Sequence, residues 1–104
     1  MPLNPLIQDR LPQLAALCSQ HRATRLDVFG SVVRLDFSPE ASDIDFLVEF
    51  EPMDAACYAK TYFDLKEGLE ALFQRPVDLL TPSALANPYL RSRVRTEQHA
   101  VFAA

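Results

Sequence analysis

The sequence lacks the features of a membrane-spanning or exported protein. None of its apolar runs approaches the roughly 20 residues that a membrane-spanning helix needs. Its first residues, Met1 to Asn4, lack the basic region and the apolar run of a signal peptide. We therefore expect a cytoplasmic protein that makes no contact with a membrane.

Basic residues and cysteines are also scarce. Ten Lys and Arg face 14 Asp and Glu, and the formal net charge is −4 at pH 7. Proteins that bind nucleic acid by neutralising many phosphates need clustered Lys and Arg in excess, so we expect no direct binding of nucleic acid. The two cysteines, Cys18 and Cys57, lie far apart without a CxxC spacing, which fits reduced thiols better than a disulfide framework or a metal site.

Glycine occurs only twice, whereas the eight prolines lie outside the main apolar runs. Prolines in such places typically mark the boundaries of helices and strands. With 104 residues, of which 49% are hydrophobic, the chain has the size and the composition of one compact globular unit. We expect residues 1–104 to form a single domain.

The spacing of apolar residues predicts an alternation of helices and strands. We expect helices over residues 11–21 and 54–73, the second capped by Asp54, and strands over 25–29, 43–50 and 77–80. A short helical turn should follow over 81–86. A last helix should start at Asn87-Pro88 and continue through Leu90, Val94 and on to Gln98 or Val101, with a frayed tail. The fold class is α+β, a small mixed sheet packed on one side by helices.

Two short motifs lie at the ends of adjacent predicted strands. Gly30-Ser31 follows the first strand, and Asp43-Ile44-Asp45 opens the second. Alternate side chains of a strand share a face, so the two carboxylates should point to one side and Ile44 to the other, into apolar packing. Two carboxylates so close together are normally kept for a shared proton or a cation, and oxygen ligands without His or Cys favour Mg²⁺ or Mn²⁺.

The Gly-Ser step supplies a complementary feature. A glycine lets the backbone approach a ligand closely, and Ser31 starts a helical turn whose free N–H groups attract anions. A phosphate cradle facing a pair of metal-binding carboxylates describes a nucleoside triphosphate bound as its magnesium complex, and the natural reaction is nucleotidyl transfer to a hydroxyl. Taken singly, an Asp pair on a solvated strand face and a Gly-Ser turn are both common.

These motifs carry a resemblance to a known family. Gly30-Ser31-x-x-Arg34, followed by Ser42-Asp43-Ile44-Asp45-Phe46-Leu47-Val48, resembles the signature of the DNA polymerase β superfamily of nucleotidyltransferases. The short length and the ending resemble its minimal branch, the MNT-domain antitoxins that pair with HEPN-domain toxins. The resemblance covers nearly the whole chain and implies the nucleotidyltransferase fold.

The resemblance also implies roles for individual residues. Asp43 and Asp45 would bind both of two Mg²⁺ ions, and Asp78 would be the third carboxylate, on a strand that can pair beside the second. Gly30 and Ser31 would contact the triphosphate of ATP.

Arg34 matches the family's arginine one turn after the serine, where a guanidinium can meet phosphate or brace the carboxylates. An ion pair with Asp36 or Glu40 on the protein surface is the alternative. Leu35 stands where many relatives have glycine.

By the same resemblance, we expect an antitoxin that transfers AMP from ATP to a hydroxyl, that of a tyrosine, on a cognate HEPN ribonuclease, with which it forms a hetero-oligomer. The alternative is a binding module that neutralises the toxin by contact, with little or no catalysis. Modification of a small molecule is disfavoured, because relatives of that kind carry a further substrate-binding domain. Arg91 and Arg95, one turn apart on the last helix, are either contacts for a partner or part of a solvated face. Tyr58 and Tyr62 are either core and rim or a border for the adenine.

Overall fold

The structure, a computed structural model, describes residues 3–34 and 43–104. These residues form four strands, four α-helices and two 3-10 turns. The helices are α1 (Pro5–Gln8), α2 (Leu11–Gln20), α3 (Ala55–Phe73) and α4 (Pro88–Glu97). The strands are β1 (Ala23–Phe29), β2 (Ile44–Phe50), β3 (Val77–Leu80) and β4 (His99–Ala103), and the 3-10 turns are η1 (Gly30–Val32) and η2 (Pro82–Ala86).

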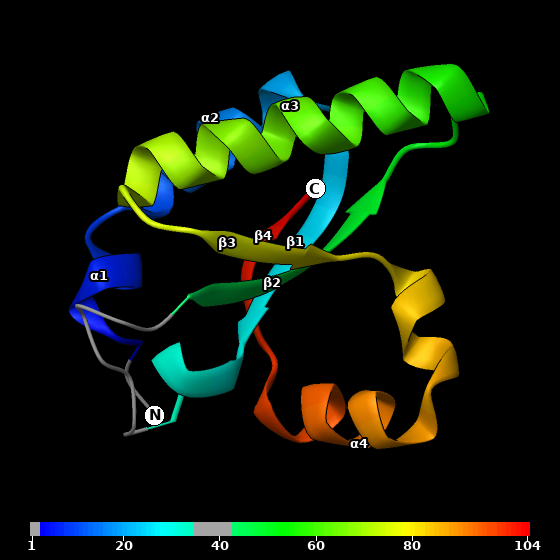
Figure 1. The fold of residues 1–104 in the computed structure, drawn as a ribbon. Helices are drawn as coiled ribbons and strands as arrows, with labels where there is room; N and C mark the ends of the chain where they lie inside the picture. Colours follow the sequence, from blue (N-terminus) through cyan, green and yellow to red (C-terminus); the bar gives the residue numbers. More distant parts are fainter. Residues whose placement is uncertain (1–2, 35–42) are drawn as a thin grey trace.

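The four strands form one mixed sheet in the order β3-β2-β1-β4 (Figure 1). Strand β1 runs antiparallel to both of its neighbours, whereas β2 and β3 are parallel. A parallel connection needs a crossover, and α3 supplies it. The mixed sheet and the adjacency of the first three strands confirm the predicted fold class.

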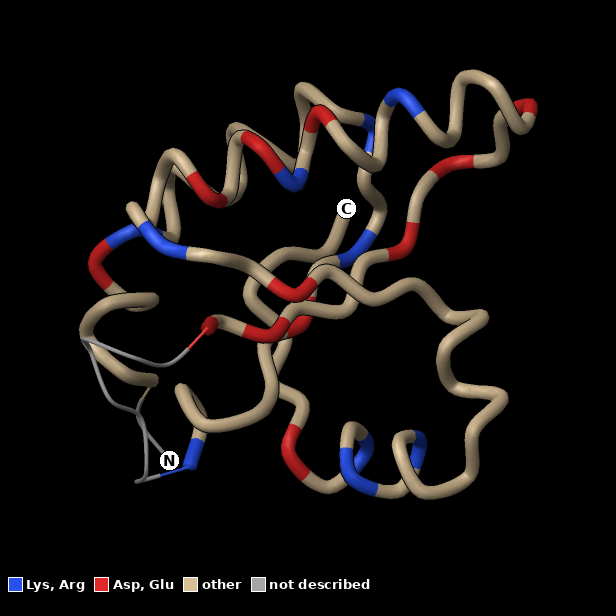
Figure 2. Tube along the Cα trace, viewed as in Figure 1, with Lys and Arg blue, Asp and Glu red and all other residues tan. Residues whose placement is uncertain are grey.

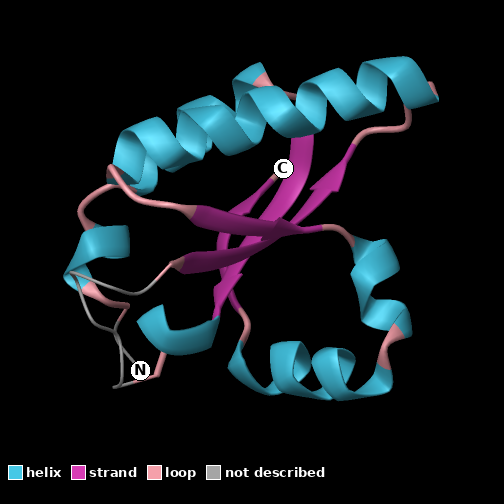
Figure 3. Ribbon diagram, viewed as in Figure 1, coloured by secondary structure: helices cyan, strands magenta, loops and turns pink. Residues whose placement is uncertain are grey.

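One face of the sheet carries the main hydrophobic core. Helices α2 and α3 lie over this face (Figure 3), as predicted. The inward side chains of β2, namely Ile44, Phe46 and Val48, are fully buried there, together with Leu65 and Leu69 of α3. The period-2 alternation of the strand and the apolar stripe of the helix therefore meet in one layer.

The other face is covered only in part, by α4 and η2 (Figure 1). Val94 of α4 is fully buried against Phe29 of β1 and Leu47 of β2, and Leu85 and Leu90 pack on this smaller cluster. Helix α4 therefore differs from the prediction that all helices pack on one side of the sheet. It leaves the ends of β2 and β3 uncovered at the positions of the predicted carboxylates, since Asp43 and Asp78 are exposed.

The helix boundaries follow local chemistry. Asp54 caps α3 as predicted, because its side chain accepts a hydrogen bond of 2.8 Å from the backbone N–H of Cys57. The same helix ends at Gln74, which adopts the left-handed conformation with a φ of 55°. Asn87 caps α4 by accepting hydrogen bonds from the backbone N–H groups of Tyr89 and Leu90.

The prediction for the end of the chain was wrong. Helix α4 ends at Glu97, and residues 99–103 form strand β4 on the free edge of β1 instead of a continued or frayed helix. Pairing satisfies backbone groups that the edge of β1 would otherwise expose. Val101 and Phe102 also pack against the main core, which helical spacing from Val94 would not allow.

The helices and the cysteines can also be compared with the expectations from the sequence. In the part of the chain that the structure describes, no helix combines the length and the apolar character that a membrane span requires. Cys18 is buried, Cys57 is partly exposed, and both are free thiols, as predicted.

Candidate active site

The end of β1 and the start of β2 meet at Gly30 and Asp45. Gly30 has a φ of 80°, a backbone conformation that L side chains rarely adopt. A Cβ atom at this position would lie 2.0 Å from Oδ2 of Asp45. The carboxylate of Asp45 therefore lies directly against the Gly30 backbone, and only glycine leaves room for it.

Asp45 and Asp78 are neighbours across the parallel β2–β3 pair. They are register partners, and both alternate with residues buried in the main core, so they point to the opposite face. Asp43 lies just before β2 and is exposed, as is Asp78, whereas Asp45 is partly buried. Figure 2 shows acidic positions of β2 and β3 at this part of the sheet and basic positions on α4. The predicted alternation is confirmed for Ile44 and Asp45, which lie on opposite faces of β2, whereas Asp43 lies outside the strand.

Negative charge accumulates at Asp45. Burial, reinforced by the charges of Asp78 and Asp43, raises the pKa of Asp45 to about 6 from its ordinary value of 3.8. The guanidinium groups of Arg93 and Arg34 act in the opposite direction and lower this pKa. A bound cation would favour the ionised form in the same way as these arginines do.

Carboxylate oxygens make up the donor set, which suits a hard divalent cation such as Mg²⁺. Across residues 3–34 and 43–104, however, no three Asp, Glu, His or Cys side chains are gathered closely enough to form a ready-made metal site. Asp43, Asp45 and Asp78 thus lie near the N-terminal ends of the neighbouring strands β2 and β3 without forming a closed set of ligands. Like charges repel at short range, which favours such spreading.

Gly30 and Arg34 are joined by a residue that the sequence analysis did not single out, Glu97 at the end of α4. Its Oε1 accepts a hydrogen bond of 3.1 Å from the Gly30 N–H, and its Oε2 lies 2.6 Å from Nη1 of Arg34. Nε of Arg93, one turn earlier on α4, is 3.4 Å from Oε1. Asp36 and Glu40, the predicted alternative partners of Arg34, and Leu35 lie outside the described residues.

Sequence separation explains why Glu97 was missed. It contacts Gly30 across 67 positions of the chain, and the spacing of residues along one sequence gives no signal for such a contact. Only the i,i+4 spacing of Arg93 and Glu97 could have suggested their ion pair.

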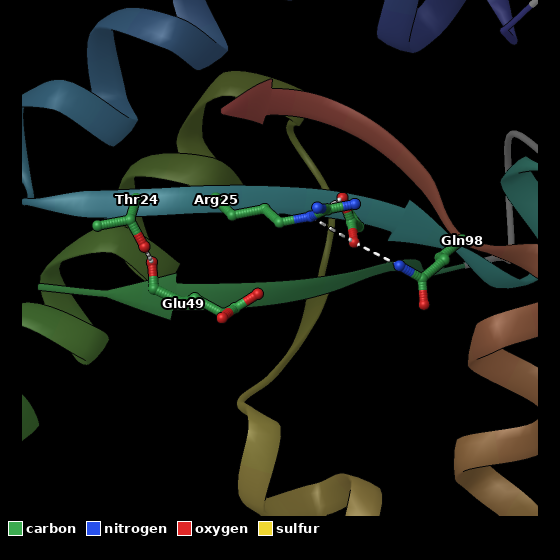
Figure 4. A network of polar contacts seen from close by, with 5 residues as sticks. Thr24, Arg25, Glu49 and Gln98 are labelled. Atoms are coloured by element: carbon green, nitrogen blue, oxygen red, sulfur yellow. Dashed lines mark hydrogen bonds and ion pairs between the residues drawn. The ribbon is translucent and has the colours of Figure 1, made fainter. Parts of the chain in front are cut away.

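Asp27, another carboxylate on the face of the sheet that carries Asp45, has a different environment from Asp43 and Asp78. The side chain of Asp27 in β1 is only 2% exposed and accepts hydrogen bonds from Nε of Arg25 and Nε2 of Gln98. Figure 4 shows the side chains of Arg25 and Gln98 in this network, with dashed lines for their interactions. Nearby, Thr24 Oγ1 donates a hydrogen bond of 3.2 Å to the carbonyl of Glu49. Asp27 is therefore a buried group with donors on both sides, unlike the exposed Asp43 and Asp78.

The two tyrosines of α3 make packing and hydrogen-bond contacts, whereas two arginines of α4 are exposed. The hydroxyl of Tyr62 donates a hydrogen bond of 2.5 Å to the carbonyl of Leu79, which ties α3 to β3. Burial, together with the Asp78 charge, raises the pKa of Tyr62. The ring of Tyr58 packs edge-on against Phe50, with centroids 5.3 Å apart. Arg91 and Arg95 are exposed on α4. These contacts account for the two tyrosines as core and rim.

Comparison with known proteins places the chain in a family. A model of the nucleotidyltransferase domain matches residues 13–101. Two proteins of Methanocaldococcus jannaschii, each named as a putative protein adenylyltransferase, are 31% and 33% identical to the chain over 81 residues, which are 78% of this chain and 79% of theirs.

Solved structures of similar proteins also have the nucleotidyltransferase fold. A structure described as a putative minimal nucleotidyltransferase aligns with a TM-score of 0.71 and 36% identity, over 88% of this chain and 89% of its own. A structure of the tri-AMPylated Shewanella oneidensis HEPN toxin in complex with MNT antitoxin aligns with a TM-score of 0.63 and 19% identity, over 94% of this chain and 73% of that one. At that identity the second likeness shows the fold alone. Because the family model spans both motif-bearing strands and most of the chain, the protein belongs to the nucleotidyltransferase domain family.

Proposed function

We propose that the protein is an antitoxin that transfers AMP from ATP to a hydroxyl, that of a tyrosine, on a cognate HEPN-domain toxin. The observation that carries the proposal is the placement of Asp45 between its register partner Asp78 and the Gly30-Ser31 turn. Carboxylates of the kind that bind Mg²⁺ and a turn of the kind that binds phosphate are therefore neighbours, which supports the proposal. Residues 1–104 would act as a single domain in the cytoplasm, without binding nucleic acid.

In the reaction, the acceptor oxygen forms a bond to the α-phosphorus of ATP, the bond to the pyrophosphate oxygen breaks so that pyrophosphate leaves, and the proton of the hydroxyl passes to water. Two Mg²⁺ ions held by Asp43, Asp45 and Asp78 would supply stabilisation of the negative charge on the phosphates. Gly30 and Ser31 would bind and orient the triphosphate. Arg34 would add a cation close to the same phosphates.

Two findings support this acceptor. The curated relatives carry the name of protein adenylyltransferases, and solved structures of the same fold include an MNT antitoxin bound to an AMPylated HEPN toxin. A further structure of this fold is a mutant of the MntA-HpeT toxin–antitoxin pair, with a TM-score of 0.66 and 17% identity over 90% of this chain. A protein acceptor is therefore favoured over a small molecule.

The test is a transfer assay with the purified product of the neighbouring gene. Mixing it with the protein, ATP and Mg²⁺ should add the mass of AMP to that product, and chelation of the metal should prevent the gain. The double variant Asp43→Asn with Asp45→Asn should also abolish it while preserving the fold, because an amide replaces a carboxylate with little change of volume. A toxin that is neutralised without any mass gain would contradict the proposal and support masking by contact.

A further inference from the structure

Glu97 binds three groups from two distant parts of the chain. It accepts hydrogen bonds from the Gly30 N–H and the guanidinium of Arg34, and it forms an ion pair with the guanidinium of Arg93. The Glu97 side chain is only 15% exposed, whereas those of Arg34 and Arg93 are 39% and 49% exposed, so one largely buried carboxylate pairs with two guanidinium groups that reach solvent. One carboxylate thus links the end of α4 to the Gly-Ser turn.

The ion pair with Glu97 fixes the position of Arg93. Its Nε lies 3.4 Å from Oε1 of Glu97, the oxygen that accepts the hydrogen bond from the Gly30 N–H. The positive charge of Arg93, like that of Arg34, lowers the pKa of Asp45. Arg93 therefore lies within electrostatic range of the candidate site, although it comes from an element that the motif residues do not include.

Arg93 and Arg34 bring two guanidinium groups to a place that also holds the carboxylates of Glu97 and Asp45. A phosphate bound at the Gly-Ser turn would need such cations beside it, because the carboxylates repel it.

We propose that Arg93 is a second phosphate-binding arginine of the nucleotide site, and that Glu97 is the positioning residue that holds Arg93 and Arg34 beside Gly30. The proposal deepens the proposed function and rests on it, since it names a residue that would contact the triphosphate of the same ATP. Arg93 has the planar fork of donors that suits phosphate oxygens.

The first experiment measures binding of Mg-ATP, by calorimetry, in the absence of any acceptor. Arg93→Ala should weaken the affinity by about tenfold or more, the usual effect of losing a charge-assisted hydrogen bond. Arg91→Ala is the matched control, because it removes the same charge from another exposed position of the same helix, two residues before Arg93, and should change the affinity less than threefold. Arg93→Lys should recover part of the loss, since it keeps the charge without the fork.

Inorganic tripolyphosphate with Mg²⁺ serves as the second probe. If Arg93 contacts phosphate, its removal should weaken the binding of tripolyphosphate by the same factor as that of ATP. Equal losses in the Arg93 and Arg91 variants would overturn the inference and leave the proposed function intact. A wild-type protein that binds no Mg-ATP would overturn both.

Substitution of Glu97 tests its positioning role, because the loss of a nearby negative charge would by itself strengthen the binding of ATP. If Glu97 positions the arginines, Glu97→Ala and the milder Glu97→Gln should both weaken Mg-ATP binding and raise KM in the transfer assay more than they lower kcat. The loss should also not add to that of Arg93→Ala, because the two residues act as one unit. Tighter ATP binding by either Glu97 variant would mean that this carboxylate blocks the site, and would overturn the positioning role. The Gln variant retains an oxygen for the Gly30 N–H and guards against a failure to fold.

Discussion

The two faces of strand β2 perform different tasks. Ile44, Phe46 and Val48 enter the main core beneath α2 and α3, whereas Asp45 and Leu47 point to the face that α4 covers only in part. Stability is therefore concentrated on one face and the candidate chemistry on the other. Because side chains alternate with a period of two, a slip of one residue would place the carboxylates in the core, so burial of the first face fixes the geometry of the second.

The largest expected effects come from adjacent residues on the two faces. Phe46→Ala should cost roughly 3 to 5 kcal/mol of unfolding free energy, because it leaves a cavity in a fully buried site. Asp45→Asn should leave the fold intact and reduce AMP transfer by about a thousandfold, since several kcal/mol of metal-dependent stabilisation would be lost. Urea unfolding and the transfer assay, run on both variants, check this. A catalytically impaired but fully stable Phe46 variant would contradict the division between the faces.

The only two glycines of the sequence offer a second contrast. Gly30→Ala combines a positive φ with a clash against Asp45, and should cost about 1 to 3 kcal/mol and displace that carboxylate, so transfer should also fall. A Cβ at Gly68 in α3 would approach only the end of the Leu17 side chain, at 2.9 Å. The gain in helix propensity, about 1 kcal/mol, should roughly offset the shift of Leu17.

The Gly68→Ala variant therefore serves as the control for Gly30→Ala. Its transfer activity should equal that of the wild type, and its unfolding free energy should change by less than about 1 kcal/mol. If the two alanine variants lost activity equally, the contact between Gly30 and Asp45 would not be what matters for transfer.

The sequence predicted correctly the elements that depend on the spacing of residues close together in the chain. Alternation placed Ile44 and Asp45 on opposite faces of β2, and the short run around Asp78 was correctly assigned to a strand beside it. Strand β4 was missed because Val101 also falls at helical spacing from Val94, and only the free edge of β1 decides between the two structures. Short α1 was missed as well.

The contacts of Glu97 with Gly30 and Arg34 could not be predicted from the spacing of residues along the sequence. These contacts join α4 to the Gly-Ser turn, and they depend on how α4 packs against Phe29 and Leu47. No periodicity in the sequence encodes that packing. The roles of the candidate site residues remain predictions, which the variants described above test.

On the face that α4 covers only in part, Asp27 should contribute to stability and not to transfer, unlike Asp45. Asp27→Asn should cost about 1 to 3 kcal/mol, because the amide opposes its N–H groups to the donors Arg25 and Gln98. Activity measured well below the melting temperature should stay within about twofold of the wild type, since this carboxylate is sealed among structural donors. Loss of transfer without loss of stability would instead place Asp27 in the reaction.

The smallest expected effect is a dependence of stability on pH that originates at Asp45. Its pKa is raised from 3.8 to about 6, mainly by burial. Between these two values the folded protein holds more protons at Asp45 than the unfolded chain does. The unfolding free energy contributed by this group therefore falls as the pH rises from about 4 to about 6, and the destabilisation is fully present above that range.

Subtracting the pH profile of Asp45→Asn from that of the wild type isolates this contribution, because the other carboxylates are common to both. The difference should grow between pH 4 and pH 6, with the variant the more stable protein at pH 7 in the absence of divalent metal. Saturating Mg²⁺ should reverse the order, since the ion stabilises the ionised carboxylate only in the wild type. Parallel profiles with and without Mg²⁺ would show that Asp45 holds neither a raised pKa nor a metal ion, and the two faces of β2 would then differ in packing alone.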